Sequence, residues 1–361
     1  MQGDTDIACN KNGLDDRELN KRQPITIKEV AEKAGVSQMT VSRVLNRQQL
    51  VKASTRERVE AAIAALNYRP NLMARGLAGG RSKLIGLAYY NPSPSYLSAL
   101  VVSALKHCRD LGHHLVIEDL SDIEDGQDTS LIVKRLSSIQ LDGLILAPPL
   151  SGNTKLLDLM QGIGIPTVLL GSNDDRFNQS SVVFNDRAAA YTMTSHLIAL
   201  GHTRIGFIRG PHELPWSRLR QEGYETALVD KGIKIDRKLI LEGDFTFRTG
   251  MHRGDDLLDL DDRPTAIFAS NDDMAAGVIA AAQRRRLRIP AELSVVGFDD
   301  TAIAAAIWPR LTTVRQPIAE MAEASVDIIS EVTGEGWSGE AIRVVNDTIH
   351  IIERESLAPP A

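Results

Sequence analysis

The chain has 361 residues, of which 43% are hydrophobic and 24% charged, a composition that excludes disorder as the main state and, at roughly 150 residues per domain, predicts about two to three domains. Its two cysteines, Cys9 and Cys108, exclude a disulfide framework and a four-ligand zinc site, and the lack of a run of about 18 apolar residues or of a secretory signal predicts a cytoplasmic protein with no membrane partner. Charge is uneven, because residues 21–83 carry 13 Lys and Arg against four acidic residues, whereas residues 84–361 carry 26 basic and 38 acidic residues.

The basic segment favours contact with a polyanion, although a solvated basic surface without a ligand would have the same charge. Residues 1–23 are polar, and we expect them to form a disordered N-terminal extension. A first helix is predicted to begin at Ile27, within a Thr26-x-x-Glu29 capping box, and to stop at Gly35.

A second helix is predicted from Gln38 to about Asn46, after a Ser37 cap, and a third from a Ser54-Thr55-Arg56-Glu57 capping box to about Asn67. Two short helices joined by a tight turn and followed by a third are typical of a helix-turn-helix module, here residues 24–69, whose second helix enters the major groove. A small helical bundle without a ligand is the alternative.

The outward face of the second helix carries side chains suited to reading bases. Gln38 can pair with an adenine and Arg43 with a guanine through two hydrogen bonds each, and Met39 can contact a thymine methyl group. These side chains favour DNA as the polyanion.

Residues 70–82 contain a short segment, Asn71 to Ala78, with a capping residue and a helical pattern. Two turns of helix are unstable alone in water, so this segment is predicted to become helical only when it packs against something. A plain linker is the alternative.

From Leu84 onward, short apolar runs alternate with helical stretches. Near-continuous Val, Ile and Leu runs separated by helices are typical of parallel sheets covered on both faces, and nine strands predict two doubly wound halves. The predicted strands are Leu84–Tyr89, His114–Glu118, Gly143–Ala147, Thr167–Leu170, Ser181–Phe184, Ile205–Arg209, Ala266–Ala269, Ser294–Gly297 and Ala341–Val345.

Polar and aromatic residues follow many of these strands, at the edge where doubly wound sheets bind ligands. Carboxylates and amides can pair with neighbouring hydroxyls while a ring covers sugar carbons, so a cleft of this composition favours a polyhydroxylated ligand. Each residue alone could be a turn former or a helix cap. The residues include Tyr90, Asn91, Ser172, Asn173, Asn185, Asp186, His212, Trp216, Arg218, Arg220, Asn271, Asp272, Asp299 and Asp300.

Catalysis has little support in the sequence. Residues 84–361 contain no phosphate-binding loop, dinucleotide fingerprint, nucleophile elbow or His-Glu-x-x-His motif. Paired carboxylates at Asp272/Asp273 and Asp299/Asp300 could serve a glycosidase, but adjacent side chains diverge and helix N-termini favour Asp for capping. We therefore expect neither an enzyme nor a cofactor or metal site.

Several motifs, in order from about residue 24 to 355, resemble the lactose-repressor/galactose-repressor (LacI/GalR) family of bacterial transcription regulators. The motifs are Thr26-Ile27-Lys28-Glu29-Val30-Ala31, Ala34-Gly35-Val36-Ser37, Thr40-Val41-Ser42-Arg43-Val44-Leu45-Asn46, Asn67-Tyr68-Arg69-Pro70-Asn71, Leu77-Ala78, Leu200-Gly201-His202, Ser270-Asn271-Asp272, Ser294-Val295-Val296-Gly297-Phe298-Asp299-Asp300 and Leu311-Thr312-Thr313-Val314.

This resemblance implies a homodimeric repressor on a pseudo-palindromic operator. Residues 70–82 would be a hinge helix and linker, in which the helix from Asn71 to Ala78 folds on DNA with Leu77 wedged into the minor groove. The DNA-binding residues implied are Thr26, Ser37, Gln38, Met39, Thr40, Ser42, Arg43, Asn46, Asn71, Ala74 and Leu77.

Residues 83–358 would form an effector-binding and dimerisation domain similar to a periplasmic sugar-binding protein. Its N-lobe would comprise about residues 83–184 and 317–344, and its C-lobe about 185–314 and 345–358. A carbohydrate-type effector between the lobes would shift operator affinity allosterically. The effector-binding residues expected are Tyr90, Asn91, Ser172, Asp186, Trp216, Arg218, Phe245, Asn271, Asp299 and Gln316.

Gly171 stands where the lactose-type pocket carries an acidic residue, and Tyr90 stands where that pocket has a small one. The effector therefore need not be lactose-like. No leucine heptad follows Ile352, which favours a dimer over a tetramer. The alternatives are a sugar-binding transport component, a carbohydrate-active enzyme, and a regulator controlled by a partner protein rather than a sugar.

Overall fold

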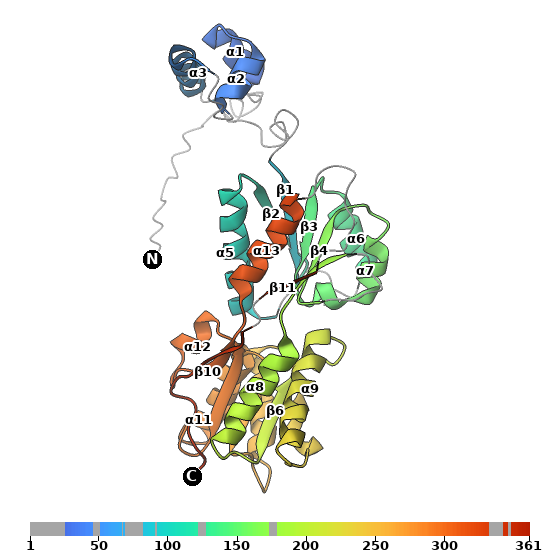
Figure 1. Ribbon diagram of the computed structural model, residues 1–361, viewed down its shortest axis with the longest axis vertical. Helices are drawn as coiled ribbons and strands as arrows, with labels where there is room; N and C mark the ends of the chain where they lie inside the picture. The colour runs from blue at the N-terminus through green and yellow to red at the C-terminus, as the bar shows by residue number, and fades with distance from the viewer. Residues whose placement is uncertain are drawn as a thin grey trace, which may run out of the picture. The chain divides into compact units, whose positions relative to one another are not determined.

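The computed structural model describes residues 26–45, 51–66, 68, 82–90, 92–121, 128–172, 179–331, 342–345 and 348–361. It divides into two compact units, Met1–Arg81 and Ser82–Ala361, called here the head and the body (Figure 1). The predicted N-terminal extension and the predicted helix from Asn71 to Ala78 lie outside the described residues.

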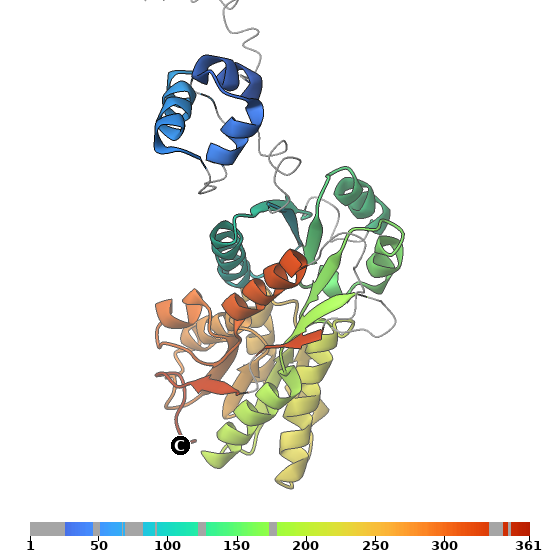
Figure 2. The ribbon, with the colours of Figure 1, turned by 45° about the horizontal axis from the view of Figure 1, so that its top comes forward.

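The head contains helices α1 (Ile27–Ala34), α2 (Gln38–Leu45) and α3 (Ala53–Leu66), seen in Figure 2. α1 begins and ends as predicted, because the Thr26 amide and hydroxyl donate to the Glu29 carboxylate at 2.6 and 2.9 Å and Gly35 adopts a φ of 62°. The predicted start of α3 is wrong by two residues, because the helix begins at Ala53 and not after a Ser54 cap. The Lys52 carbonyl accepts the first amides of this helix, so Ser54 lies inside the first turn.

The three helices enclose a small core. Val30, Val41 and Val59, one from each helix, have no exposed surface. The Arg58 guanidinium on α3 donates to the carbonyls of Ala34 and Gly35, at 2.5 and 3.0 Å, which fixes the turn between α1 and α2. The predicted helix-turn-helix arrangement is therefore present, and the apolar side of α2 packs against α1 and α3.

The first sheet of the body is entirely parallel, with the strand order β11-β5-β4-β3-β1-β2. Helices α5 (Pro94–Asp110) and α13 (Ile318–Glu331) pack on one face, and α6 (Thr129–Ser137) and α7 (Thr154–Met160) on the other. The strands are β1 (Leu84–Tyr89), β2 (His114–Asp119), β3 (Gly143–Leu146), β4 (Thr167–Leu170), β5 (Ser180–Val183) and β11 (Ile342–Val344).

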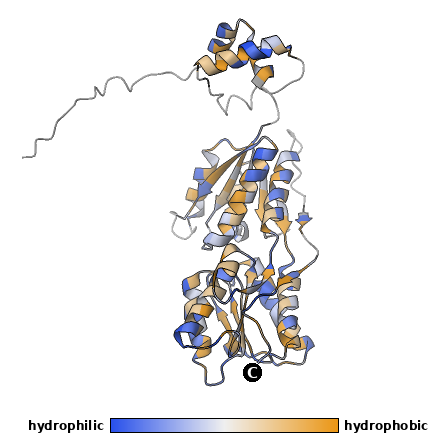
Figure 3. Ribbon diagram, turned by 90° about the vertical axis from the view of Figure 1, so that its left-hand side faces the viewer, coloured by the Kyte–Doolittle hydropathy of each residue, from blue (hydrophilic) through white to orange (hydrophobic). Residues whose placement is uncertain are grey.

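The second sheet has the order β12-β10-β9-β8-β6-β7 and is parallel except for β12. One face carries the helices α8 (Asp186–Ala199) and α9 (Pro215–Asp230), and the other carries α10 (Phe247–Leu258) and α11 (Asp272–Arg284), with apolar strands between (Figure 3). The remaining elements are β6 (Ile205–Arg209), β7 (Ile240–Glu242), β8 (Ala266–Ala269), β9 (Ser294–Asp299), α12 (Ala302–Ala306), β10 (Thr312–Arg315) and β12 (His350–Ile352).

All nine predicted strands are present, with ends shifted by at most two residues, and the prediction of two doubly wound sheets is confirmed. Sequence analysis missed β7, β10 and β12. Two of these are three-residue strands at sheet edges, and β10 is polar in composition although it lies inside the sheet. Thr312 and Thr313 are buried there because their hydroxyls donate to the Arg354 carbonyl and the Asp272 carboxylate.

The chain passes between the two sheets three times: from β5 to α8, from β10 to α13, and from β11 to β12. We call the first sheet with its helices the N-lobe and the second the C-lobe. None of the helices in the described ranges has the length and apolar character that a membrane span requires.

We predict that Gly277→Ala destabilises the body by roughly 1 to 3 kcal/mol, the cost of overpacking a close helix contact. A Cβ atom at Gly277 on α11 would lie 2.2 Å from the Phe247 carbonyl oxygen and 2.5 Å from the Met251 amide nitrogen, both of α10. Urea unfolding measures the change. Gly162→Ala is the control, since its Cβ would meet no atom closer than 3.7 Å; equal stability of the two variants would contradict this account.

Candidate functional site

The exposed face of α2 carries the side chains that the sequence suggested for base reading. Gln38, Met39 and Arg43 are all exposed, Met39 by 65%, and the Arg43 guanidinium contacts the Met39 sulfur at 3.6 Å. Ser42 is half-buried beside them. A face of this kind can present a fork of donors and an apolar group to base edges.

Residues proposed for phosphate contacts lie at the starts of α1 and α2. The Thr40 amide donates to the Ser37 hydroxyl at 3.2 Å, and Thr26 precedes the first turn of α1. Helix N-termini attract phosphate through unpaired amides and the helix dipole. Four other residues predicted to bind DNA lie outside the described residues: Asn46, Asn71, Ala74 and Leu77.

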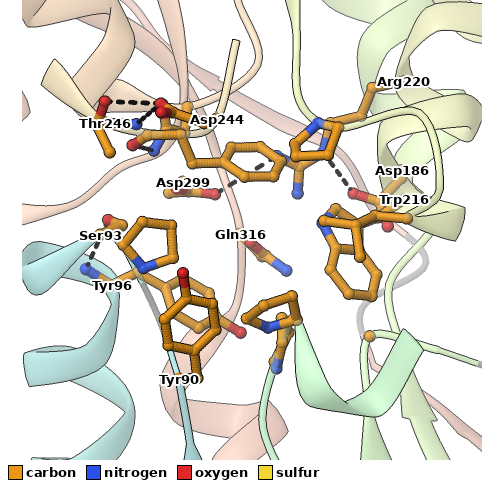
Figure 4. A pocket seen from close by; sticks show the side chains of 18 of the residues that line it. Tyr90, Ser93, Tyr96, Asp186, Trp216, Arg220, Asp244, Thr246, Asp299 and Gln316 are labelled. Atoms are coloured by element: carbon orange, nitrogen blue, oxygen red, sulfur yellow. Dashed lines mark hydrogen bonds and ion pairs between the residues drawn. The ribbon is translucent and has the colours of Figure 1, made fainter. Parts of the chain in front are cut away.

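The body contains a cavity of about 330 Å³ between the N-lobe and the C-lobe (Figure 4). Strand ends and helix starts from both sheets surround it, as expected for doubly wound sheets. It is lined by Tyr90, Pro92, Ser93, Tyr96, Pro148, Pro149, Gly171, Asp186, Pro211, Glu213, Leu214, Trp216, Arg220, Asp244, Phe245, Thr246, Asn271, Asp299 and Gln316.

Arg220 organises the charged wall of this cavity. Its Nε donates to the Asp186 carboxylate at 2.7 Å and its Nη1 to the Ser270 carbonyl at 2.5 Å, and Nη1 lies 3.9 Å from Asp299. The guanidinium also covers the Phe298 ring, 3.6 Å from the ring centre. A buried guanidinium with this set of partners holds α8, α9, β8 and β9 in one arrangement.

Burial governs the acidic groups of this wall. It raises the pKa of Asp186 despite the opposing Arg220 charge, and it raises the pKa of Asp299 well above its ordinary value. Neighbouring Asp272 does not line the cavity; burial raises its pKa to about 7, although Thr301 and Thr313 donate to it. Asp186 and Asp299, which line the cavity, can therefore exchange hydrogen bonds with a ligand in an environment shielded from water.

Aromatic rings form the other walls. Trp216 is only 5% exposed. Phe245 has a φ of 67°, and the side-chain amide of Asn271 holds this conformation by donating a 2.9 Å hydrogen bond to the Phe245 carbonyl. The Phe245 ring fits because Gly210 has no side chain: a Cβ there would lie 2.1 Å from the ring. With Tyr90 these rings can cover the carbon face of a sugar.

Two polar atoms of the cavity wall lack hydrogen-bond partners among the described residues. They are the Tyr96 hydroxyl, whose side chain is buried, and the Gln316 Oε1, whose side chain is 8% exposed. Gln316 points into the middle of the cavity in Figure 4, between the two lobes. Buried polar atoms without partners are costly, and a ligand hydroxyl can satisfy them.

The structure brings seven of the ten predicted effector-binding residues to the cavity: Tyr90, Asp186, Trp216, Phe245, Asn271, Asp299 and Gln316. Gly171, noted as a departure, also lines it. Asn91 lies outside the described residues, and Ser172 is buried without lining the cavity.

Arg218 does not line the cavity, and its role in effector binding stays a prediction. Its guanidinium donates to the carbonyls of His212 and Glu213, at 3.2 and 3.0 Å. Arg220 occupies the wall instead, because residues four apart in α9, Trp216 and Arg220, share a helix face. That spacing was visible in the sequence. Ser93, Tyr96 and Asp244 were also missed, since nothing in a single sequence shows which residues at or just before a helix start face a cleft.

No group of three or more His, Cys, Asp or Glu side chains in the described ranges is arranged to hold a metal ion.

Comparisons with known proteins match both units. Residues 26–71 match the family described as bacterial regulatory proteins, lacI family, and residues 194–357 match a periplasmic binding protein-like domain. The ribose operon repressor of Escherichia coli (strain K12) is 33% identical over 309 residues, covering 84% of this chain and 92% of that protein.

Two solved structures cover nearly the whole chain. The lac repressor dimer bound to operator and the anti-inducer ONPF has a TM-score of 0.77 and 32% identity, over 93% of this chain and 100% of that one. A complex of the transcriptional regulator CelR with cellobiose has a TM-score of 0.67 and 28% identity, over 92% and 99%.

We predict that Arg220→Met lowers the free energy of unfolding by roughly 3 to 5 kcal/mol at pH 8, because it leaves Asp186 and Asp299 buried without their cation. Urea unfolding of Arg218→Met provides the matched control, since that side chain bonds only to two backbone carbonyls of a loop.

The loss should be smaller at pH 5. Burial raises the pKa of both carboxyls above the unfolded value of about 3.8, so the folded protein retains their protons to higher pH. Stability from such groups is fully present below the unfolded pKa and is lost as pH rises through the folded pKa. A loss independent of pH would contradict the burial of these carboxyls.

Proposed function

Because the chain belongs to the lacI family of bacterial regulatory proteins, we propose that it is a transcriptional repressor whose affinity for operator DNA is set by a small carbohydrate bound between the N-lobe and the C-lobe. It is a DNA-binding regulator and not an enzyme. The observation that carries the proposal is the occurrence, in one chain, of a base-reading helix face and a cavity lined by carboxylates, amides and aromatic rings.

In this proposal α2 enters the major groove. Gln38 and Met39 read bases, with Ser42 and Arg43 beside them. Thr26, Ser37, Thr40 and Asn46 hold phosphates, and Asn71, Ala74 and Leu77 belong to the hinge segment. Because the regulator acts on chromosomal DNA, its place of action is the cytoplasm, at the nucleoid.

The functional unit in this proposal is a homodimer, which presents two copies of α2 to a pseudo-palindromic operator. The N-lobe offers apolar surface for such an interface, since Val102 and Leu105 of α5 are 61% and 42% exposed. Apolar side chains at this spacing on a helix suit contact with a second helix.

Effector binding would act by shifting the N-lobe relative to the C-lobe. The two lobes already touch across the cleft, where the Ser93 hydroxyl of the N-lobe donates to the Asp273 carboxylate of α11. A ligand that contacts both lobes favours the closed arrangement, and it changes operator affinity by its preference for one state.

We predict that Arg43→Ala weakens binding to operator DNA from upstream of the protein's own gene by about 10- to 100-fold, the loss of a paired base contact. Fluorescence anisotropy with operator and scrambled duplexes measures it. Lys33→Ala is the control, because it removes one positive charge from α1 rather than α2. If both variants lost affinity equally for both duplexes, α2 would not be the recognition helix.

We predict that a sugar that raises the melting temperature of the body also changes operator affinity. Asp299→Asn should abolish both effects while operator binding without the sugar persists, because Asp299 lines the cavity and lies outside the head. Asp259→Asn, an exposed carboxylate of the C-lobe, is the matched control. A sugar that releases DNA identifies an inducer, and one that tightens binding identifies a co-repressor. A sugar that stabilises the protein without changing operator affinity would contradict the proposal.

A further inference from the structure

The two walls of the cavity differ in charge. Within the described lining, every charged side chain comes from the C-lobe: Asp186, Glu213, Arg220, Asp244 and Asp299. The N-lobe wall consists of tyrosines, prolines, a serine and a glycine. A ligand between the lobes therefore meets charged groups on its C-lobe side and an uncharged wall, rich in proline and tyrosine, on its N-lobe side.

The one cation among these charged residues is already neutralised. Arg220 donates to Asp186 at 2.7 Å and lies 3.9 Å from Asp299, so its charge is matched before any ligand arrives. The lining then has four carboxyl groups against one guanidinium. Sites for phosphate or carboxylate ligands instead present unmatched Arg or Lys side chains or open helix N-termini.

Four of the five helices that begin beside the cavity have N-termini occupied by the protein's own side chains, and the fifth, α9, begins at Pro215, which has no amide hydrogen to donate. Acidic residues Asp186, Asp272 and Asp273 lie in the first turns of α8 and α11, where they match the helix dipole. Four of the helices have N-cap side chains that accept a first-turn amide: Ser93 from Tyr96, Asn185 from Ala188, Thr246 from Thr249, and Asn271 from Met274.

The unpartnered atom at the centre requires a donor. Gln316 Oε1 can only accept a hydrogen bond. A sugar hydroxyl donates to such an atom, whereas a phosphate dianion or a carboxylate offers only acceptor oxygens. Burying an anion against the carboxyl groups of the lining would cost both its hydration and like-charge repulsion.

We infer that the effector is an uncharged sugar with two parts: a hydroxyl-bearing ring against the carboxylates of the C-lobe, and a second ring with an apolar face against Tyr90 and the prolines of the N-lobe. This inference rests on the proposed function. It excludes sugar phosphates and sugar acids and favours disaccharides and aryl glycosides over free monosaccharides.

The test is calorimetric titration of the full-length protein with matched compounds: glucose, galactose and mannose, each as the free sugar, the nitrophenyl glycoside and the 6-phosphate, together with cellobiose. For any sugar that binds, we expect the nitrophenyl glycoside or the disaccharide to bind at least about tenfold more tightly than the monosaccharide, and the phosphate at least about tenfold more weakly. Tyr90→Leu should remove the advantage of the nitrophenyl group, whereas Phe247→Leu, on a side chain that is 44% exposed and outside the cavity, should retain it.

The outcomes separate the two proposals. A phosphate that binds more tightly than its parent sugar, or an aryl glycoside that gains nothing over the monosaccharide, overturns this inference and leaves the sugar-responsive repressor standing. Binding of none of the compounds overturns this inference. Tight binding of a nitrophenyl glycoside or cellobiose that leaves operator affinity unchanged supports the two-part site but overturns the proposed function, and with it the assignment of that ligand as the effector.

Discussion

The body depends on one buried cation. The Arg220 guanidinium reaches the start of α8 through Asp186, the end of β8 through the Ser270 carbonyl, and the end of β9 near Asp299. It also covers Phe298, whose ring meets the edge of Phe184, where the chain leaves the N-lobe. A buried charge must keep its partners, so these strand ends cannot move independently. The C-lobe therefore presents a fixed wall to whatever enters the cleft.

Backbone geometry at the same edge reinforces this rigidity. Phe245, Asp299 and Asp300 have φ values of 67°, 112° and 58°, in the left-handed region that residues with side chains rarely adopt. Each is held by tertiary contacts: the Asp300 carboxylate pairs with Arg315 at 2.8 Å and Arg354 at 2.6 Å, beside the segments that cross to the N-lobe. Strained residues held in this way are typical of ligand sites. Two of the three crossing segments are thus anchored on the C-lobe side.

The two units use electrostatics in opposite ways. The head leaves Gln38 and Arg43 exposed on α2, where a long polyanion can meet them in water. In the body, Arg220 is the one cation among the described residues that line the cavity, and it is buried against the Asp186 carboxylate. Such a lining suits a small neutral molecule that can donate hydrogen bonds. The exposed guanidinium of Arg43 therefore suits contact with a nucleic acid, whereas the buried and paired guanidinium of Arg220 suits a site for a neutral sugar.

Sequence alone determined the helix-turn-helix pattern, nine of the strands and the doubly wound architecture, because capping residues and apolar runs act over a few neighbouring residues. Seven of the ten residues it predicted for effector binding line the cleft, since ligand sites follow strand ends in such sheets. Only the tertiary structure decided that Arg220 rather than Arg218 lines the cavity, that the polar strand β10 lies inside a sheet, and that Tyr96 and Gln316 keep unpartnered polar atoms there. Those outcomes depend on which helix face meets the other lobe and on hydroxyls paired across distant segments, and neither is encoded in local pattern.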